Sequence, residues 1–288
     1  MSQTLCKAPI IDLNKLEKSK RGSNSWLELC NGVRLALEDH GYFIALYDKV
    51  SSEVEKEIFD VMDELFDLPI ETKKKNSSDF YFYRWVGQLE AAPLHESFGI
   101  VYPTHIQALQ SFTTLMWPQG NQRFSETVTS YVKVAAELEQ LVDKMVFESY
   151  GVAERHYESH IAATTYLLRP TKIRLMVCKL KVKVVIGLLL MSLLLHSSSW
   201  LAWSNGRIYA PRHQVLLKEE KQRYTLALFT FNKGITDIPE ELVDETHPLQ
   251  YKPFDNFGLA WYYLSGANSM IHSTAKAYCG INTTASIA

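Results

Sequence analysis

The spacing of apolar residues in the first half of the chain predicts mainly helices. Apolar side chains recur every three or four residues over Trp26–Leu37, Val54–Leu68 and Val128–Tyr150, as in amphipathic helices that bury one face. We expect Ser25 to cap the first of these helices and His40-Gly41 to end it. Shorter apolar runs at 10–13 and 42–46 predict strands.

Three other features of this half have competing interpretations. Lys73-Lys74-Lys75 lies in a polar stretch, and we interpret it as a solvated helix end or loop rather than a phosphate site. The aromatic run Phe80–Trp85 is typical of core or a strand edge, and the alternative is the lining of a small-molecule pocket. His156 and Glu158 have the spacing of an H-x-E metal pair, but we interpret the polar stretch around them as solvated surface.

In the second half, the pattern changes to the alternation of strands from Arg207 onward. The runs 212–217 and 222–229 flank the polar turn 219–221 and predict a β-hairpin. Side chains alternate across a strand, so this register places on one face the residues His213, Val215, Leu217, Arg223, Thr225 and Ala227.

Arg223 is the unusual member of this face. A guanidinium on an apolar face is unfavourable unless an anion pairs with it, and its planar fork suits a carboxylate. Thr225 adds a hydroxyl donor on the same side. The alternative is a different register, in which Arg223 faces water.

Composition narrows the class of protein. The chain has 288 residues, a formal net charge of −2 and four cysteines without a C-x-x-C pair. Near-neutral charge argues against a nucleic-acid binder, and the cysteine spacing argues against a zinc site or a disulfide framework. With no signal peptide visible at the start, we expect a cytoplasmic, monomeric protein that binds a small molecule and contacts neither nucleic acid nor membrane.

Several motifs, in their order along the chain, resemble the plant 2-oxoglutarate- and Fe(II)-dependent dioxygenases, and within them the AOP-type branch. The matching segments are Ala8–Leu13, His40–Phe43, Pro93–Ile100 with the pattern P-L-x-E-S-x-G-I, Asn205–Val215 with N-G-R-x-x-x-P-x-H-x-V, Arg223–Thr225 with R-x-S/T, Lys252–Asp255 and Lys276–Ile281. The resemblance covers most of the chain.

The resemblance implies a mixed α+β fold, with a helical N-terminal region over 1–165 and a double-stranded β-helix (jelly-roll) region over 166–288. It also implies Fe(II) held by two histidines and a carboxylate, with three positions left for 2-oxoglutarate and O₂. His213 matches an iron-binding histidine of that family, and Arg223 and Thr225 match the pair that holds 2-oxoglutarate.

The chain departs from the family where the other two iron ligands belong. It contains no H-x-D, and no Asp or Glu lies between Ser159 and Lys218. His213 is therefore the single iron ligand that remains from the family pattern, and we identify no catalytic residue. If another carboxylate replaced the missing iron ligand, it would have to come from Asp79, Glu90, Glu96 or Glu158.

The missing motif coincides with a leucine-rich segment, Val177–Trp200. We expect the jelly-roll to be incomplete, disrupted at about 177–203, through an internal deletion with a shifted reading frame or a mis-assigned splice junction. The apolar run Val184–Leu195 is short of the roughly 20 residues of a membrane helix, and we interpret it as a buried strand. The sequence thus predicts a dioxygenase scaffold of plant specialised metabolism with impaired catalysis; the alternative is a non-catalytic binding or remnant protein, a pseudoenzyme.

Overall fold

A computed structural model describes residues 8–18, 21–90, 95–173, 192–211, 223–265 and 273–281 of the chain. Its helices are α1 (Asn24–Asp39), α2 (Ser52–Phe66), α3 (Ile70–Lys73), α4 (Ile106–Met116), α5 (Gln122–Ser149), α6 (Glu154–Ala163), α7 (Ser192–Trp203), α8 (Asn256–Leu264) and α9 (Thr274–Cys279). Its strands are β1 (Ile10–Asp12), β2 (Ile44–Leu46), β3 (His95–Ser97), β4 (Ile100–Val101), β5 (Thr164–Ile173), β6 (Arg223–Asn232), β7 (Ile235–Thr236) and β8 (Phe254–Asp255). Short 3₁₀ turns cover Leu13–Lys18, Tyr81–Tyr83 and Glu240–Leu242. The predicted combination of helices and sheet is confirmed.

The three helices predicted from apolar spacing are present as α1, α2 and α5. The predicted cap of α1 was wrong, because the N-cap is Ser23 and not Ser25. Ser23 has an extended backbone, and its side-chain hydroxyl accepts a hydrogen bond from Trp26 N. Ser25 is already inside the first turn, where its backbone is helical. Gly41, with φ +75°, follows the helix as expected.

The polar stretch around His156 and the end of the predicted apolar strand are both helical. The stretch around His156 forms α6. Ser192–Leu195, the end of the apolar run predicted as a strand, begins α7, whose Trp200 and Trp203 are buried against α5 and α1 in one core cluster. The rest of that run lies outside the described residues.

The main sheet has four strands, and β5 is its centre. β6 runs antiparallel along one edge of β5, from Thr164↔Asn232 to Ile173↔Arg223, while β3 and β4 pair with the other edge. Two further pairs, parallel β1–β2 and antiparallel β7–β8, stand apart from this sheet. The partner strand predicted for Arg223, residues 212–217, lies outside the described residues.

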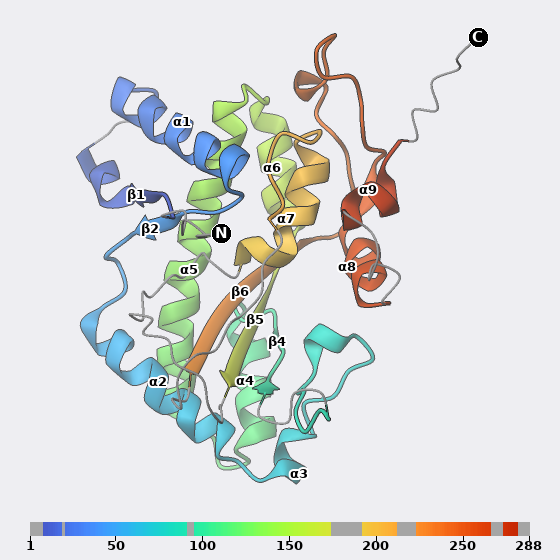
Figure 1. The fold of residues 1–288 in the computed structure, drawn as a ribbon. Helices are drawn as coiled ribbons and strands as arrows, with labels where there is room; N and C mark the ends of the chain where they lie inside the picture. Colours follow the sequence, from blue (N-terminus) through green and yellow to red (C-terminus); the bar gives the residue numbers. More distant parts are fainter. Residues whose placement is uncertain are drawn as a thin grey trace, which may run out of the picture.

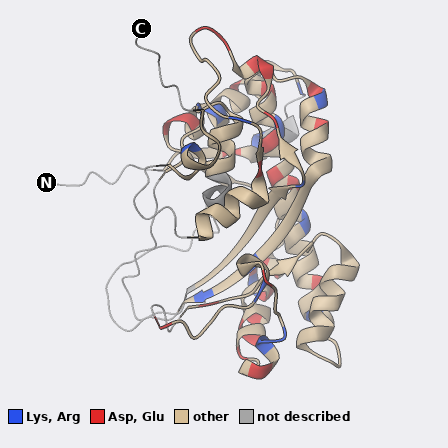
Figure 2. Cartoon of the chain, turned by 90° about the vertical axis from the view of Figure 1, so that its right-hand side faces the viewer, with Lys and Arg blue, Asp and Glu red and all other residues tan. Residues whose placement is uncertain are grey.

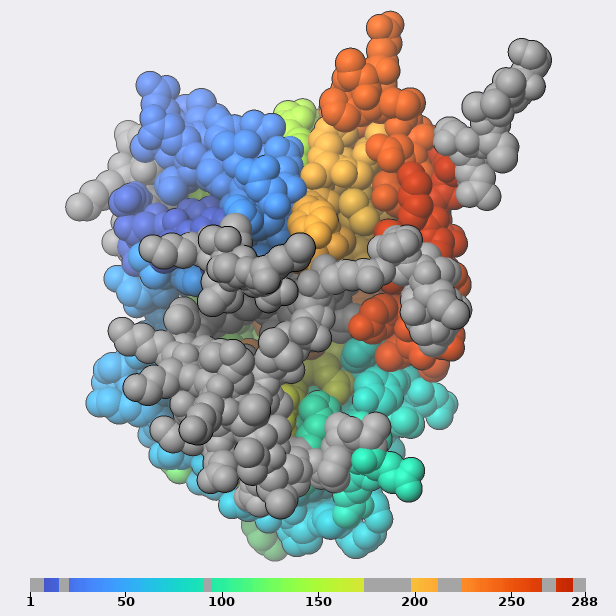
Figure 3. All heavy atoms as spheres, in the orientation of Figure 1, coloured from blue at the N-terminus to red at the C-terminus, as the bar shows by residue number. Residues whose placement is uncertain are grey.

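Helices cover one face of this sheet, which we call the back face. Tyr166, Leu168 and Leu228 pack there against apolar residues of α2, α4 and α5, and Figure 1 shows α5 running the length of the sheet with α2 and α4 beside it. The opposite face, which we call the front face, is covered by the aromatic turn 80–83 and α8. In Figure 3 these two segments, teal and orange-red, lie next to each other.

The surface and the helices give two further facts. Acidic and basic residues are interspersed over the side shown in Figure 2, in keeping with the near-neutral charge. Within the described ranges, no helix is both long enough and apolar enough to cross a membrane.

Candidate functional site

The front face of the β5–β6 pair includes Thr225, one of the residues predicted to bind a ligand. Alternate residues of the two strands form it: Thr165, Leu167, Arg169, Thr171, Thr225, Ala227, Phe229 and Phe231. At one end of this face, the pair Leu167↔Phe229 is apolar, and the hydroxyl of Thr165 donates to the carbonyl oxygen of its partner Phe231. Toward the other end, Arg169 and Thr171 are polar. The face therefore changes from core to polar site along the strands.

Thr225, one of the two residues predicted to hold 2-oxoglutarate, lies in β6. It is half-buried and directly opposite Thr171, which is buried. Arg223 occupies the last rung of the ladder, opposite Ile173, and its position two residues before Thr225 belongs to the same face. The side chain of Arg223 lies outside the described part of the chain.

Asn205, the first residue of the N-G-R motif, anchors the chain eight residues ahead of the predicted iron histidine. Its backbone is left-handed, with φ +53°, and the side-chain amide donates to the carbonyl oxygens of Leu242, His247 and Pro248 at 3.1–3.3 Å. Its Oδ1 accepts from Gln250 N at 2.8 Å. The buried side chain of Asn205 thus hydrogen-bonds backbone groups of residues 242–250, about forty residues further along the chain.

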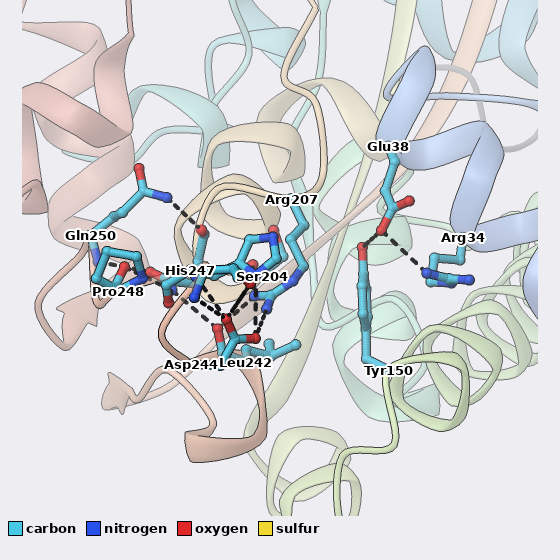
Figure 4. Close-up of polar contacts among 12 residues, drawn as sticks. Arg34, Glu38, Tyr150, Ser204, Arg207, Leu242, Asp244, His247, Pro248 and Gln250 are labelled. Atoms are coloured by element: carbon cyan, nitrogen blue, oxygen red, sulfur yellow. Dashed lines mark hydrogen bonds and ion pairs between the residues drawn. The ribbon is translucent and has the colours of Figure 1, made fainter.

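Arg207 reinforces the same contact (Figure 4). It donates to the carbonyl oxygen of Leu242 at 2.6 Å and approaches Asp244 Oδ2 at 3.4 Å. Asp244 in turn bonds His247. Asn205 and Arg207 of the N-G-R motif therefore anchor this segment to residues 242–250.

Gly41 connects the His40–Phe43 motif to this anchor. A Cβ on Gly41 would lie 2.3 Å from the Tyr209 carbonyl oxygen and 2.4 Å from Pro211 Cδ, and Tyr209 N donates to Leu37 O at 3.0 Å. Only glycine allows this approach and the positive φ together. Two motifs distant in sequence therefore hold the segment 207–211, which leads to His213; His213 itself lies outside the described residues.

Arg169 is the charged residue that sequence reasoning missed. It is buried, with 6% of its surface exposed, and donates to the Phe82 carbonyl oxygen and to Ser97 Oγ. Its guanidinium also lies over the rings of Tyr81 and Phe82, at 5.9 and 5.5 Å. Burial lowers the pKa of Arg169 to about 10, so it remains a cation at neutral pH.

The segment that matches P-L-x-E-S-x-G-I supports this arginine. Ser97 supplies its hydroxyl acceptor, and the absence of a side chain on Gly99 lets the 80–83 turn approach: a Cβ there would lie 2.3 Å from Phe82 O. Glu96 pairs with Lys73 at 2.8 Å. The interpretation of Lys73 as solvated was wrong, because this ion pair lets a lysine with 5% exposure be buried; Lys74 is exposed as predicted.

His95 lies at the rim of the same face. It shares the side of β3 with Ser97 because side chains alternate. Its Nδ1 is buried and has no hydrogen-bond partner among the described residues. Burial, followed by the positive charge of Arg169, lowers the pKa of His95, so the imidazole is neutral.

No described residues assemble a metal centre. Within the described ranges, no three His, Cys, Asp or Glu side chains lie close enough to hold an ion. Of the distant carboxylates considered for rescue, Glu96 is engaged by Lys73, whereas Asp79, Glu90 and Glu158 are exposed.

A second buried polar cluster, on the back face, also had no signal in the sequence. Glu139 and Asp143 from α5 meet His160 of α6, with 3.1 Å between His160 Nε2 and Asp143 Oδ2, and Tyr166 donates to Glu139. Burial raises the pKa of Asp143 to about 7 and lowers that of His160 to about 4. Burial therefore disfavours the charged form of both groups.

Comparison with known proteins identifies the family. The family described as "non-haem dioxygenase in morphine synthesis N-terminal" matches residues 8–119. The probable 2-oxoglutarate-dependent dioxygenase AOP1.2 of Arabidopsis thaliana is 31% identical, over 94% of this chain and 95% of the relative. The probable inactive 2-oxoglutarate-dependent dioxygenase AOP2 of the same plant is 27% identical, over 96% and 99%.

Solved structures share the fold. The rice dioxygenase for auxin oxidation superposes with a TM-score of 0.72 at 20% identity, covering 96% of this chain and all of that one. The Arabidopsis dioxygenase for auxin oxidation 1, in its binary complex with 2-oxoglutarate, gives a TM-score of 0.66 at 22% identity, covering 84% and 99%.

Proposed function

The chain belongs to the AOP branch of the plant 2-oxoglutarate-dependent dioxygenases, and we propose that it retains the binding strand for 2-oxoglutarate but lacks a competent iron centre. One observation carries the first part: the R-x-T strand is present as β6, with Thr225 half-buried beside Thr171. Arg223 would take the distal carboxylate of 2-oxoglutarate in a bidentate pair, and Thr225 would donate its hydroxyl to the same group.

The proposal extends to the architecture. Residues 1–165 form the helical N-terminal region and residues 166–288 the jelly-roll region, incomplete around 177–203. The four-stranded sheet around β5 supports a jelly-roll. The alignment with AOP1.2 spans 310 positions, more than the 288 residues of this chain, so the relative contains residues that have no counterpart here.

The residues present do not fit Fe(II). A competent site needs two histidines and a carboxylate on one face of the metal, and His213 is the one residue that matches them, because no H-x-D exists in the sequence. When bound, iron supplies the activation of O₂ that this family uses.

The ligand class follows from the family. The names of relatives as dioxygenases, and of fold neighbours for auxin oxidation, support descent of this scaffold from an enzyme that acts on a small plant metabolite. In this chain, 2-oxoglutarate binding without turnover is the expected activity.

Calorimetric titration with 2-oxoglutarate tests the binding half of the proposal. The wild-type protein should bind it, Arg223→Met should abolish the heat signal, and Thr225→Val should weaken binding by about 3- to 10-fold through the loss of one hydrogen bond. Arg123→Met removes an exposed arginine of α5 that pairs with Glu64 at 2.9 Å, and serves as the control. Equal binding by the Arg223 variant and the wild type would refute the assignment.

An anaerobic titration with Fe(II) and 2-oxoglutarate tests the other half. We expect no visible charge-transfer band and no succinate after O₂ is admitted. A chimera in which an H-x-D-bearing segment of a relative replaces Val177–Trp200 should restore the band. A stoichiometric band from the unaltered chain would show that it assembles an iron site from other residues, and that it is an active dioxygenase.

A further inference from the structure

We propose that Arg169 and His95 belong to the 2-oxoglutarate site and bind the second carboxylate of the ligand in the place of a metal, so that the site takes dicarboxylates as a class. The inference rests on the proposed function, because it takes the first carboxylate to be held by Arg223 and Thr225. In the family pattern, open positions on the iron hold part of 2-oxoglutarate. The residues of this chain do not form that iron centre, so another group has to hold this end of the ligand.

Two neighbouring rows of the front face carry the polar groups of the site, where a row is the set of residues paired directly across β3, β5 and β6. The rows are Ser97, Thr171 and Thr225, and His95, Ile173 and Arg223. They lie two residues apart along the strands, which corresponds to about 7 Å at roughly 3.4 Å per residue.

The polar groups lie on both sides of β5. Neighbouring strands are roughly 4.8 Å apart, so β3 and β6 are separated by about 10 Å. Arg169 comes from β5, but its Nη2 donates to Ser97 Oγ, which brings the guanidinium to the β3 side. Burial and, after it, the charge of Arg169 lower the pKa of His95, so these two groups are close together. Arg223 and Thr225 start from the β6 side, and a five-carbon dicarboxylate that lies across β5 can meet both sides.

The charge of Arg169 supports a carboxylate on the β3 side. Its two hydrogen-bond acceptors, Phe82 O and Ser97 Oγ, are both neutral. Among the described residues no carboxylate pairs with it, whereas the equally buried Lys73 and Lys172 both face carboxylates. A buried cation without a counter-ion is costly to a fold. A guanidinium has five N–H donors, so donors remain for a carboxylate of the ligand.

The unbonded nitrogen of His95 supports the same position. Its Nδ1 is buried and has no partner among the described residues, although buried polar atoms are normally hydrogen-bonded. Because the ring is neutral, Nδ1 can carry a proton and donate it to a carboxylate oxygen.

The two rows lie at the open end of the face. His95, Ile173 and Thr225 are half-buried, whereas Leu167 and Phe229, further along the strands, are 0% and 5% exposed. A ligand at the two rows therefore does not have to enter the apolar core below the aromatic turn.

This arrangement sets the specificity of the site. Both ends of the ligand meet cationic or N–H donor groups, which favours two carboxylates over one. No metal chelates the keto group of 2-oxoglutarate, so that group contributes little to affinity. The site therefore accepts 2-oxoglutarate and glutarate alike, and its affinity does not depend on Fe(II).

The experiment compares three ligands by calorimetry with the full-length protein in EDTA. They are 2-oxoglutarate, glutarate, which lacks the keto group, and glutaramate, in which one carboxylate of glutarate is a primary amide. We expect 2-oxoglutarate and glutarate to bind within about 3-fold of each other, and glutaramate to bind about 10- to 100-fold more weakly through the loss of one charge-assisted contact. Anaerobic Fe(II) in place of EDTA should leave the affinities unchanged.

Variants assign the second carboxylate to its residues. Arg169→Met should weaken both dicarboxylates by about 10- to 100-fold and remove the preference for glutarate over glutaramate. Arg169→Lys, which keeps the charge but not the planar fork, should lie between Arg169→Met and the wild type. His95→Leu should weaken the dicarboxylates by about 3- to 10-fold.

Lys172→Met is the matched control. Lys172 is a buried cation of the same strand, but it pairs with Asp63 and Asp67 of α2, on the back face. Its removal should leave all three affinities unchanged. Circular dichroism verifies that each variant is folded, and the comparison of ligands in the wild type needs no variant.

The outcomes separate this inference from the proposed function. If 2-oxoglutarate does not bind the wild type at all, the proposed function fails. If 2-oxoglutarate binds but glutarate does not, if EDTA abolishes binding, or if glutaramate binds as tightly as glutarate, the proposed binding strand stands and this inference is refuted. If Arg169→Met weakens glutarate and glutaramate equally, Arg169 acts through the fold alone and the inference is likewise refuted.

Discussion

The side-chain amide of Asn76 bonds both backbone groups of Gly99. Nδ2 donates to the Gly99 carbonyl oxygen at 3.1 Å, and Oδ1 accepts from Gly99 N at 3.3 Å. The same Nδ2 lies 3.4 Å from the carbonyl oxygen of Tyr83. One buried asparagine therefore joins the end of β3 to the aromatic turn, and so determines where the acceptors of Arg169 lie.

This junction predicts a large effect of a single methyl group. Gly99→Ala places a Cβ 2.3 Å from Phe82 O, against backbone that cannot easily move, and should lower the free energy of unfolding by about 1–3 kcal/mol, as overpacking does. Urea unfolding measures it. Gly32→Ala is the matched control, because nothing lies within 4 Å of its Cβ in the middle of α1, and it should stabilise the fold by about 0.5–1 kcal/mol. Equal stability of the Gly99 variant and the wild type would show that the contact relaxes freely.

The buried ion pair of Lys73 should couple more strongly than its exposed neighbour. Lys73 and Glu96 form a pair with exposed side-chain fractions of 6% and 28%, while Lys74 and Glu71 have 52% and 84%. A double-mutant cycle with Lys73→Met and Glu96→Gln should give a coupling energy of about 1–3 kcal/mol. The Lys74–Glu71 cycle should give at most about 0.5 kcal/mol. Similar values in the two cycles would contradict the burial of Lys73.

The Asn205 anchor should not tolerate a carboxylate. Asn205→Asp replaces a donor that faces three carbonyl oxygens by an acceptor, and should destabilise the protein by about 3 kcal/mol or more through the unsatisfied, charged group. Asn31→Asp, on the exposed face of α1, is the control and should change stability by less than about 0.5 kcal/mol. Thermal unfolding distinguishes the two; a stable Asn205 variant would mean that the loop finds other donors.

The cluster behind the sheet predicts opposite pH slopes for two variants. Burial raises the pKa of Asp143 to about 7, so its contribution favours folding at low pH and is lost as the pH rises through about 7. Burial lowers the pKa of His160 to about 4, so its contribution is present above about pH 6.5 and is lost as the pH falls through about 4. In the wild type, these two slopes oppose each other.

Removing one member should expose the slope of the other. Between about pH 4.5 and 6.5, the free energy of unfolding of Asp143→Asn, relative to the wild type, should rise with pH by about 1.4 kcal/mol per unit, and that of His160→Gln should fall by a similar amount. Urea unfolding at several pH values measures both. Profiles parallel to the wild type would show that neither group changes its pKa on folding.

The local pattern of the sequence determined the elements and the alternation of faces. The apolar spacing predicted α1, α2 and α5, because each of these helices buries one stripe of its own residues. The period of two placed Thr225 and Ala227 on one face of β6, and the structure confirms that Ala227 is buried there. These features depend on residues a few positions apart, so they can be predicted from the sequence alone.

Only the tertiary structure decided which polar residues are buried and what they meet. The sequence predicted a solvated Lys73, but in the fold its ammonium pairs with Glu96. The burial of Arg169 could not be predicted, because its acceptors, Phe82 and Ser97, come from distant segments. Burial of a polar group depends on partners brought together by folding. Hydrophobic periodicity, a local property of the chain, contains no information on those partners.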